Sequence, residues 1–167
     1  MMDKQQVNRH GLLDKSKEYI NIVIHEIRLL SRQQVTPQKT INIKELIGEL
    51  TQDLNMNTRA GTRFYCRIAD NLSIDEDLKL NIYRIVQEQI NNILKYADAT
   101  QATISINQAS GNVFVSIIDN GKGFDTLLKR KGIGIANIIN RIESYNGEVT
   151  IESSPGKGCK LEIRIPN

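Results

Sequence analysis

Three polar side chains recur at helical spacing in the middle of the chain. Glu88, Asn92 and Lys95 stand at positions i, i+4 and i+7, while the neighbouring positions are apolar. One helix face would therefore carry a carboxylate, an amide oxygen and an ammonium group in a line. Such a set suits a hard divalent cation together with a phosphate. The same spacing also describes an ordinary solvated stripe on an amphipathic helix.

Two glycine-containing segments follow this stretch. Asp119-Asn120-Gly121-Lys122-Gly123 comes directly after a β-branched run. An Asp at the end of such a strand can accept a hydrogen bond from an exocyclic amine, and glycines let the backbone approach a flat ligand. The alternative is a tight turn, for which Asp-Asn-Gly is common.

The second segment, Gly132-Ile133-Gly134-Ile135, opens a predicted helix. Backbone N–H groups at a helix N-terminus form a natural phosphate site. The spacing matches neither the Gly-x-x-x-x-Gly-Lys-Ser/Thr loop nor the dinucleotide fingerprint, which excludes the two commonest nucleotide motifs.

The hydrophobic pattern predicts the elements that must position these side chains. Ser73, with Glu76 three residues later, is a candidate capping box for the helix that carries the polar face. The sequence predicts helices at 43–55, 73–96 and 135–145, and strands at 63–69, 103–107, 113–118, 149–152 and 160–165. We therefore expect an α+β fold, a two-layer sandwich whose mostly antiparallel, mixed sheet carries helices on one face.

A further helix is expected ahead of this unit. Apolar residues from Leu13 to Leu30 follow alternating steps of three and four until Thr36-Pro37 ends the pattern. Either this helix packs on its own domain, or it belongs to an intermolecular helical bundle, which is the favoured interpretation. The expected division is residues 1–11 disordered or left from a trimmed longer protein, 12–37 part of a dimerisation hairpin, and 38–167 the main domain.

Composition excludes several classes. With 167 residues, 40% hydrophobic and 25% charged, the chain has an ordinary globular composition. No apolar run is long enough to span a bilayer, so we expect no membrane insertion of this part. The net charge of +3 is too balanced to indicate nucleic acid. Cys66 and Cys159 are too far apart in sequence to suggest a zinc cluster, and reduced thiols indicate a cytoplasmic location.

The order and spacing of the three polar segments resemble the N, G1 and G2 boxes of the histidine-kinase-like ATPases, also called the GHKL or Bergerat fold. The resemblance covers about residues 40–167. It is greatest for short-lid bacterial sensor histidine kinases, whose helix reads Gln-Glu-x-x-x-Asn-x-x-Lys-His-Ala. Here residues 87–97 match that pattern with Tyr96 in place of His. The segment from Ser154 to Cys159 resembles the family's Ser-x-Pro-Gly-x-Gly-Thr hairpin, with Cys159 in place of Thr.

The resemblance implies ATP and Mg²⁺ as cofactors. It makes Asn92 the Mg²⁺ ligand, Asp119 the acceptor for the adenine amine and Glu88 the general base. It also implies a short lid whose cations, Lys129 and Arg130, close over the phosphates. The implied ATP-binding set is Asn92, Lys95, Tyr96, Asp119, Gly121, Gly123, Lys129, Arg130, Gly132, Ile133, Gly134 and Ile135.

The implied activity is protein-histidine kinase activity in a two-component system. The γ-phosphate would pass to a histidine on a dimerisation helix, expected to be missing from this chain, and then to the receiver domain of a response regulator. The full-length protein would be a homodimer, cytosolic or tethered to a membrane. His25 is the weaker acceptor candidate, because no Thr-Pro follows His25-Glu26-Ile27-Arg28. The alternatives are an anti-sigma-factor-type serine kinase of the same fold and a non-catalytic docking module.

Overall fold

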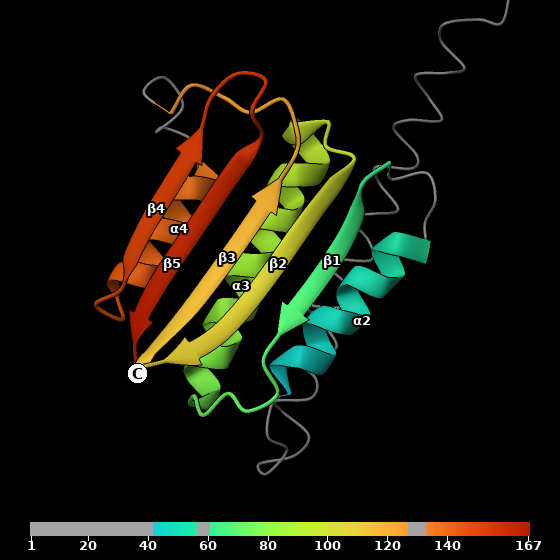
Figure 1. Cartoon of the computed structure of the whole chain (residues 1–167). Coiled ribbons are helices and arrows are strands. Elements are labelled where there is room, and N and C mark those ends of the chain that lie inside the picture. The colour runs from blue at the N-terminus through green and yellow to red at the C-terminus, as the bar shows by residue number, and fades with distance from the viewer. Residues whose placement is uncertain (1–41, 57–60, 127–132) are drawn as a thin grey trace, which may run out of the picture.

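The computed structural model describes residues 42–56, 61–126 and 133–167 (Figure 1). The predicted helix at 12–37, the boundaries of the first two predicted segments and His25 lie outside these ranges. Among the described helices, none is both long enough and apolar enough to cross a membrane.

A five-stranded mixed sheet forms one layer. Strand β1 pairs in parallel with β2, and the other neighbouring strands pair antiparallel in the order β1-β2-β3-β5-β4. The strands span Arg63–Ile68, Gln101–Ala109, Asn112–Asp119, Glu148–Ser153 and Cys159–Pro166. All five predicted strands are confirmed, each within two residues of its expected bounds.

The hairpin between β2 and β3 follows from its two turn residues. Ser110 and Gly111 have φ angles of 49° and 69°. Two consecutive positive φ angles define the turn whose twist matches paired strands, and glycine adopts such an angle without strain. Because this turn fixes the register, Ala102 of β2 pairs with Asp119, the last residue of β3.

Helices α2 (Ile43–Met56), α3 (Glu76–Asn92) and α4 (Ile133–Glu143) form the second layer. Figure 1 shows α3 and α4 against one face of the sheet and α2 beside β1. Alternate residues of the central strands, such as Ile104 and Ile117, are fully buried beneath them, as are Ile82 and Ile90 of α3. The expected α+β fold, with its two layers and mixed sheet, is therefore confirmed.

The N-terminus of α3 differs from the prediction. Asp75, rather than Ser73, is the N-cap, and its Oδ1 accepts a hydrogen bond from the Leu78 backbone N–H at 2.7 Å. The backbone N–H of Ser73 instead donates to Gln108 Oε1 at 2.8 Å. The capping box was thus wrong, because a tertiary contact with β2 holds Ser73 and the carboxylate two residues later can cap the helix.

Candidate functional site

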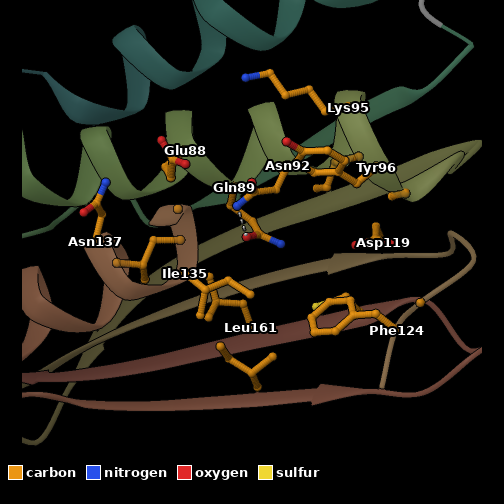
Figure 2. Close-up of a pocket in the computed structure, with 17 residues that line it drawn as sticks. Glu88, Gln89, Asn92, Lys95, Tyr96, Asp119, Phe124, Ile135, Asn137 and Leu161 are labelled. Carbon is orange, nitrogen blue, oxygen red and sulfur yellow. Dashed lines mark hydrogen bonds between the residues drawn. The ribbon is translucent and has the colours of Figure 1, made fainter. Parts of the chain in front are cut away.

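A cavity of about 650 Å³ lies between α3, α4 and the sheet, and it collects most of the described residues that the sequence singled out. In Figure 2, Glu88 and Asn137 lie at one end, Asp119 and Phe124 at the other, and Asn92 between them. The lining residues are Glu88, Gln89, Asn92, Ile93, Lys95, Tyr96, Ala97, Asp119, Gly123, Phe124, Gly134, Ile135, Asn137, Ile138, Ile151, Cys159 and Leu161.

Helix α3 supplies the polar face expected from its spacing. Glu88, Asn92 and Lys95 all line the cavity. The Asn92 side chain is oriented by its neighbour, because its Nδ2 donates to Gln89 Oε1 at 3.4 Å. This contact uses the amide nitrogen, so the Oδ1 atom of Asn92 remains available as an oxygen ligand.

The helix changes its winding directly after Asn92. Ile93–Ala97 form a π-helical turn, η1, which ends at Asp98 in the left-handed region with φ 51°. Single π-helical turns are frequent at functional sites, since the extra residue re-aims the side chains around it. Lys95 and Tyr96 are exposed and line the cavity from this turn. The sequence predicted helix to about this point but gave no sign of the wider turn.

Asp119, at the end of β3, is almost completely buried. Its relative exposure is 5%, and its Oδ1 accepts a hydrogen bond from the Gly121 N–H at 2.8 Å. Burial raises the pKa of the Asp119 carboxyl, and hydrogen bonds from the backbone N–H groups of Gly121 and Cys159 partly oppose that rise. The group offers a fixed acceptor inside a largely apolar end of the cavity.

The segment after Asp119 is held down by its backbone. The Lys122 N–H donates to the Ala97 carbonyl at 2.7 Å, and the Phe124 N–H donates to Ser153 Oγ at 3.0 Å. Gly123 has φ 59°, and a Cβ there would lie 2.1 Å from the Ser154 carbonyl oxygen. Only glycine permits this approach between the two loops.

Gly121 has a different neighbour from Gly123. A Cβ at Gly121 would lie 2.3 Å from the Ala97 carbonyl oxygen. Gly123 lines the cavity, whereas Gly121 packs against Ala97 of the π-helical turn and donates its backbone N–H to the Asp119 carboxylate.

The N-terminus of α4 closes the Glu88 end. A Cβ added at Gly134 would lie 2.3 Å from Glu88 Oε1 and 3.2 Å from Asn92 Oδ1, so the helix backbone lies directly against both oxygens. Ile135 lines the cavity, and Ile133 begins the helix. Lys129, Arg130 and Gly132, predicted as lid residues, lie outside the described residues.

Several lining residues were missed by sequence reasoning. Gln89 precedes Asn92 by three positions, and Asn137 follows Gly134 by three, so helical spacing could have indicated both. Phe124 directly follows the glycine segment but carried no separate signal.

Cys159 was identified only as a departure from the family pattern. It pairs with Asp119 across β3 and β5 and lines the cavity. Burial, followed by the negative charge of Asp119, raises the pKa of its thiol to about 11.

The protein oxygens in the cavity suit a metal ion that is also coordinated by a bound phosphate ligand. The described residues hold no group of three His, Cys, Asp or Glu side chains that could bind a metal. Mg²⁺ commonly keeps several waters and binds through one or two protein oxygens plus substrate phosphates. Asn92 Oδ1 and Glu88 Oε1, both against Gly134, provide such oxygens, so the residues present fit this kind of shared site.

Comparisons with known proteins agree with this geometry. Residues 77–167 match the family model "Histidine kinase-, DNA gyrase B-, and HSP90-like ATPase". The sensor histidine kinase ComP of Bacillus subtilis (strain 168) is 34% identical over 96 residues, which cover 56% of this chain and 12% of that protein. The chain therefore spans only a small part of that curated relative.

Solved structures show the same fold at lower identity. The histidine kinase domain of the Erythrobacter litoralis EL346 blue-light activated histidine kinase has a TM-score of 0.68 at 18% identity, with 91% of this chain and 80% of that chain covered. The Acinetobacter baumannii histidine kinase AdeS has a TM-score of 0.64 at 18% identity, with 98% and 82% covered.

Proposed function

Because the chain belongs to the family of histidine kinase-, DNA gyrase B- and HSP90-like ATPases, we propose that it is the ATP-binding catalytic domain of a two-component sensor histidine kinase. The observation that carries the proposal is the arrangement within one cavity. A buried carboxyl acceptor, Asp119, lies at one end, Glu88 and the N-terminus of α4 lie at the other, and Asn92 lies between them (Figure 2). A purine triphosphate requires both features, a hydrogen-bonding partner for its base and a region that binds its phosphates and metal ion.

The proposed orientation follows from chemistry. Asp119 accepts a hydrogen bond from the adenine amine, and the apolar side chains of Ile93, Phe124 and Leu161 surround the base. The phosphates extend toward Gly134, where the α4 N-terminus favours negative charge. Lys95 and Tyr96 contact the phosphates or the ribose from η1. For the lid, Lys129 and Arg130 remain proposed phosphate contacts.

Asn92 is the proposed Mg²⁺ ligand through Oδ1. When bound, the ion supplies charge neutralisation for the phosphates. Glu88 is proposed to act as general base or to orient the incoming nucleophile, since its carboxylate lies beside both Asn92 and Gly134. The protein thus contributes mainly position and electrostatics, which dominate phosphoryl transfer.

The partners belong to the same proposal. The acceptor is a histidine on a dimerisation helix, the full-length protein is a homodimer, and the phosphoryl group passes to a response-regulator receiver domain in the cytoplasm. ComP, named as a sensor histidine kinase, is 34% identical to this chain over 96 residues, which supports this interpretation over the serine-kinase and docking alternatives.

The proposal is tested by nucleotide binding with and without the metal. We expect Mg²⁺ to tighten ATP binding to the unmodified chain, and Asn92→Ala to remove that dependence. Asn107→Ala, on β2 away from the cavity, is the matched control and should behave like the unmodified chain. If EDTA and the Asn92 substitution both leave ATP affinity unchanged, the assignment of the metal is wrong.

The acceptor chemistry needs the full-length protein. Incubation with γ-labelled ATP should give a phosphoprotein whose label is lost in acid and retained in alkali, as expected for a phosphorylated imidazole. Label that resists acid would favour the serine-kinase alternative. Absence of ATP binding and of label would favour the docking module.

A further inference from the structure

A second cavity, the α3–α4 pocket, opens between the two helices beyond the Glu88 end of the nucleotide cavity. Its volume is about 340 Å³, and Glu88, Asn137 and Ile138 line both cavities. The α3–α4 pocket is lined by Arg84, Ile85, Gln87, Glu88, Asn91, Asn137, Ile138 and Arg141. Six of these eight side chains are polar or charged, although the pocket lies between two packed helices.

The helical spacing explains why these side chains converge. On α3, Arg84, Gln87 and Asn91 follow at steps of three and four and so share a face. On α4, Asn137 and Arg141 are four residues apart. The α4 backbone at Gly134 lies against the side chains of Glu88 and Asn92, and polar side chains one and two turns further along α4 line the pocket together with this face of α3.

Two polar atoms in this region have no hydrogen-bond partner within residues 42–56, 61–126 and 133–167. Gln87 Nε2 and Asn91 Oδ1 are both buried without a partner among the described residues, and the Gln87 side chain belongs to a residue only 6% exposed. A buried polar group without a partner costs free energy, so an unpaired donor and an unpaired acceptor together indicate a missing ligand. The cavity is also larger than a single water requires.

Charge defines the kind of ligand. Arg84 and Arg141 line the pocket, and among the lining residues that the structure describes Glu88, shared with the nucleotide cavity, is the one carboxylate. Arg141 uses Nη1 to donate to Asn81 Oδ1 at 3.2 Å, which fixes the guanidinium and leaves its other donors. Two guanidinium groups and an amide N–H suit an oxyanion.

We propose that the α3–α4 pocket is a second phosphate-binding site, separate from the nucleotide's phosphates. A hydrogen phosphate group accepts from Arg84, Arg141 and Gln87 Nε2, and its own O–H donates to Asn91 Oδ1. A carboxylate offers only acceptors and leaves Asn91 unpaired. The ligand is free inorganic phosphate or the phosphoryl group of a phosphorylated side chain, which share this chemistry.

The inference goes beyond the proposed function and is tested without nucleotide. The phosphate site and the proposed ATP binding can therefore be disproved independently. The probe is inorganic phosphate, titrated into the isotopically labelled full chain at constant ionic strength. The readout is the resonance pair of the Gln87 side-chain amide. We expect a saturable shift of this pair, and an affinity at least fivefold lower for Arg84→Gln. Arg67→Gln, an exposed arginine on β1, is the matched control and should bind like the unmodified chain.

Two further measurements distinguish free phosphate from a phosphorylated side chain, and the α3–α4 pocket from the nucleotide cavity. Phosphoramidate, which carries a nitrogen–phosphorus bond, should bind more tightly than phosphate if the phosphoryl group of a phosphorylated imidazole is the ligand, and no more tightly if free phosphate is. Acetate should bind more weakly than either. The inference is wrong if no probe shifts Gln87 saturably, or if Asn92→Ala abolishes the shift while Arg84→Gln leaves it, because the anion would then occupy the nucleotide cavity.

Discussion

Cys159 places a thiol in the wall of the candidate nucleotide cavity. The residue pairs with Asp119 across the sheet and lines the same cavity, where the related hairpin pattern carries Thr. A thiol is a weak hydrogen-bond donor, whereas a hydroxyl at this position can donate to a ligand or a bound water.

We therefore predict that Cys159→Thr binds ATP more tightly. One added hydrogen bond contributes about 1 kcal/mol, equivalent to a gain of roughly threefold to tenfold in affinity. Cys159→Val has nearly the same shape without the hydroxyl and should show no gain. Calorimetric titration of the three proteins measures the difference. Equal affinities for the Thr and Val variants would contradict the explanation.

The ionisation of Cys159 gives a second prediction. Since its thiol pKa is raised to about 11, less than one molecule in a hundred is thiolate at pH 8, and iodoacetamide should modify Cys159 roughly a hundredfold more slowly than a free cysteine. Asp119→Asn removes a negative charge that contributes to the rise, so it should speed the reaction. Mass spectrometry of the Cys159 peptide over pH 7–10 measures both rates.

The same shift sets the sign of a stability change. The unfolded thiol ionises at a lower pH than the folded one, so the folded state holds more protons between them. The free energy of unfolding should consequently fall as the pH rises from about 9 toward 11. Cys159→Ala should show a shallower fall over this range. A profile of Cys159→Ala that parallels the unmodified protein would assign the loss to other groups.

At the scale of the elements, the meeting of α3 and α4 at Gly134 is the critical contact. A side chain at this position would enter the space of Glu88 Oε1 and press on Asn92 Oδ1. Because the Glu88 side chain can rotate away, a substitution at Gly134 should disturb the geometry of the site more than it lowers the free energy of unfolding.

We predict that Gly134→Ala lowers ATP affinity about tenfold or more while changing the free energy of unfolding by less than about 1 kcal/mol. Gly48, on α2, is the matched control because an added Cβ there meets nothing within 4 Å. Gly48→Ala should stabilise the protein by about 0.5–1 kcal/mol and leave ATP binding unchanged. If both variants bind ATP equally well, Gly134 has no role in the cavity.

The elements also mark the limit of sequence reasoning. The polar face of α3 could be predicted because a step of four residues places Glu88 and Asn92 together whatever surrounds them. The position of Asp119 followed from its place after a β-branched run. The π-helical turn at Ile93–Ala97 had no signal in the local pattern. Ser73 does not cap α3 because it contacts Gln108 of β2, and that tertiary contact could not be predicted from local sequence.

Across the whole molecule, strand pairing and helix packing decide which residues, distant in sequence, come together at the two cavities. The pairing of β3 with β5 brings Cys159, forty residues away in sequence, beside Asp119. The packing of α4 on α3 brings Asn137 and Arg141 to the α3–α4 pocket. Neither follows from spacing along the chain. The resemblance to a family supplied the expected fold, but it gave no indication of a second polar cavity.

In the proposed orientation of ATP, recognition of the base depends on one buried carboxyl group. Asp119 can accept from the amine of adenine, whereas guanine presents a carbonyl oxygen at the corresponding position, which an ionised carboxylate repels. A hydrogen bond to a charged group contributes about 1.5–3 kcal/mol, so the preference for ATP over GTP should be tenfold or greater.

The most direct test is calorimetric titration of the folded chain with Mg²⁺ and a non-hydrolysable analogue of ATP, then of GTP, repeated for Asp119→Asn. We predict binding of one adenine analogue per chain, much weaker binding of the guanine analogue, and a smaller difference between them in the variant. Saturable binding of both analogues with equal affinity, or no heat with either for protein shown to be folded, would contradict the account.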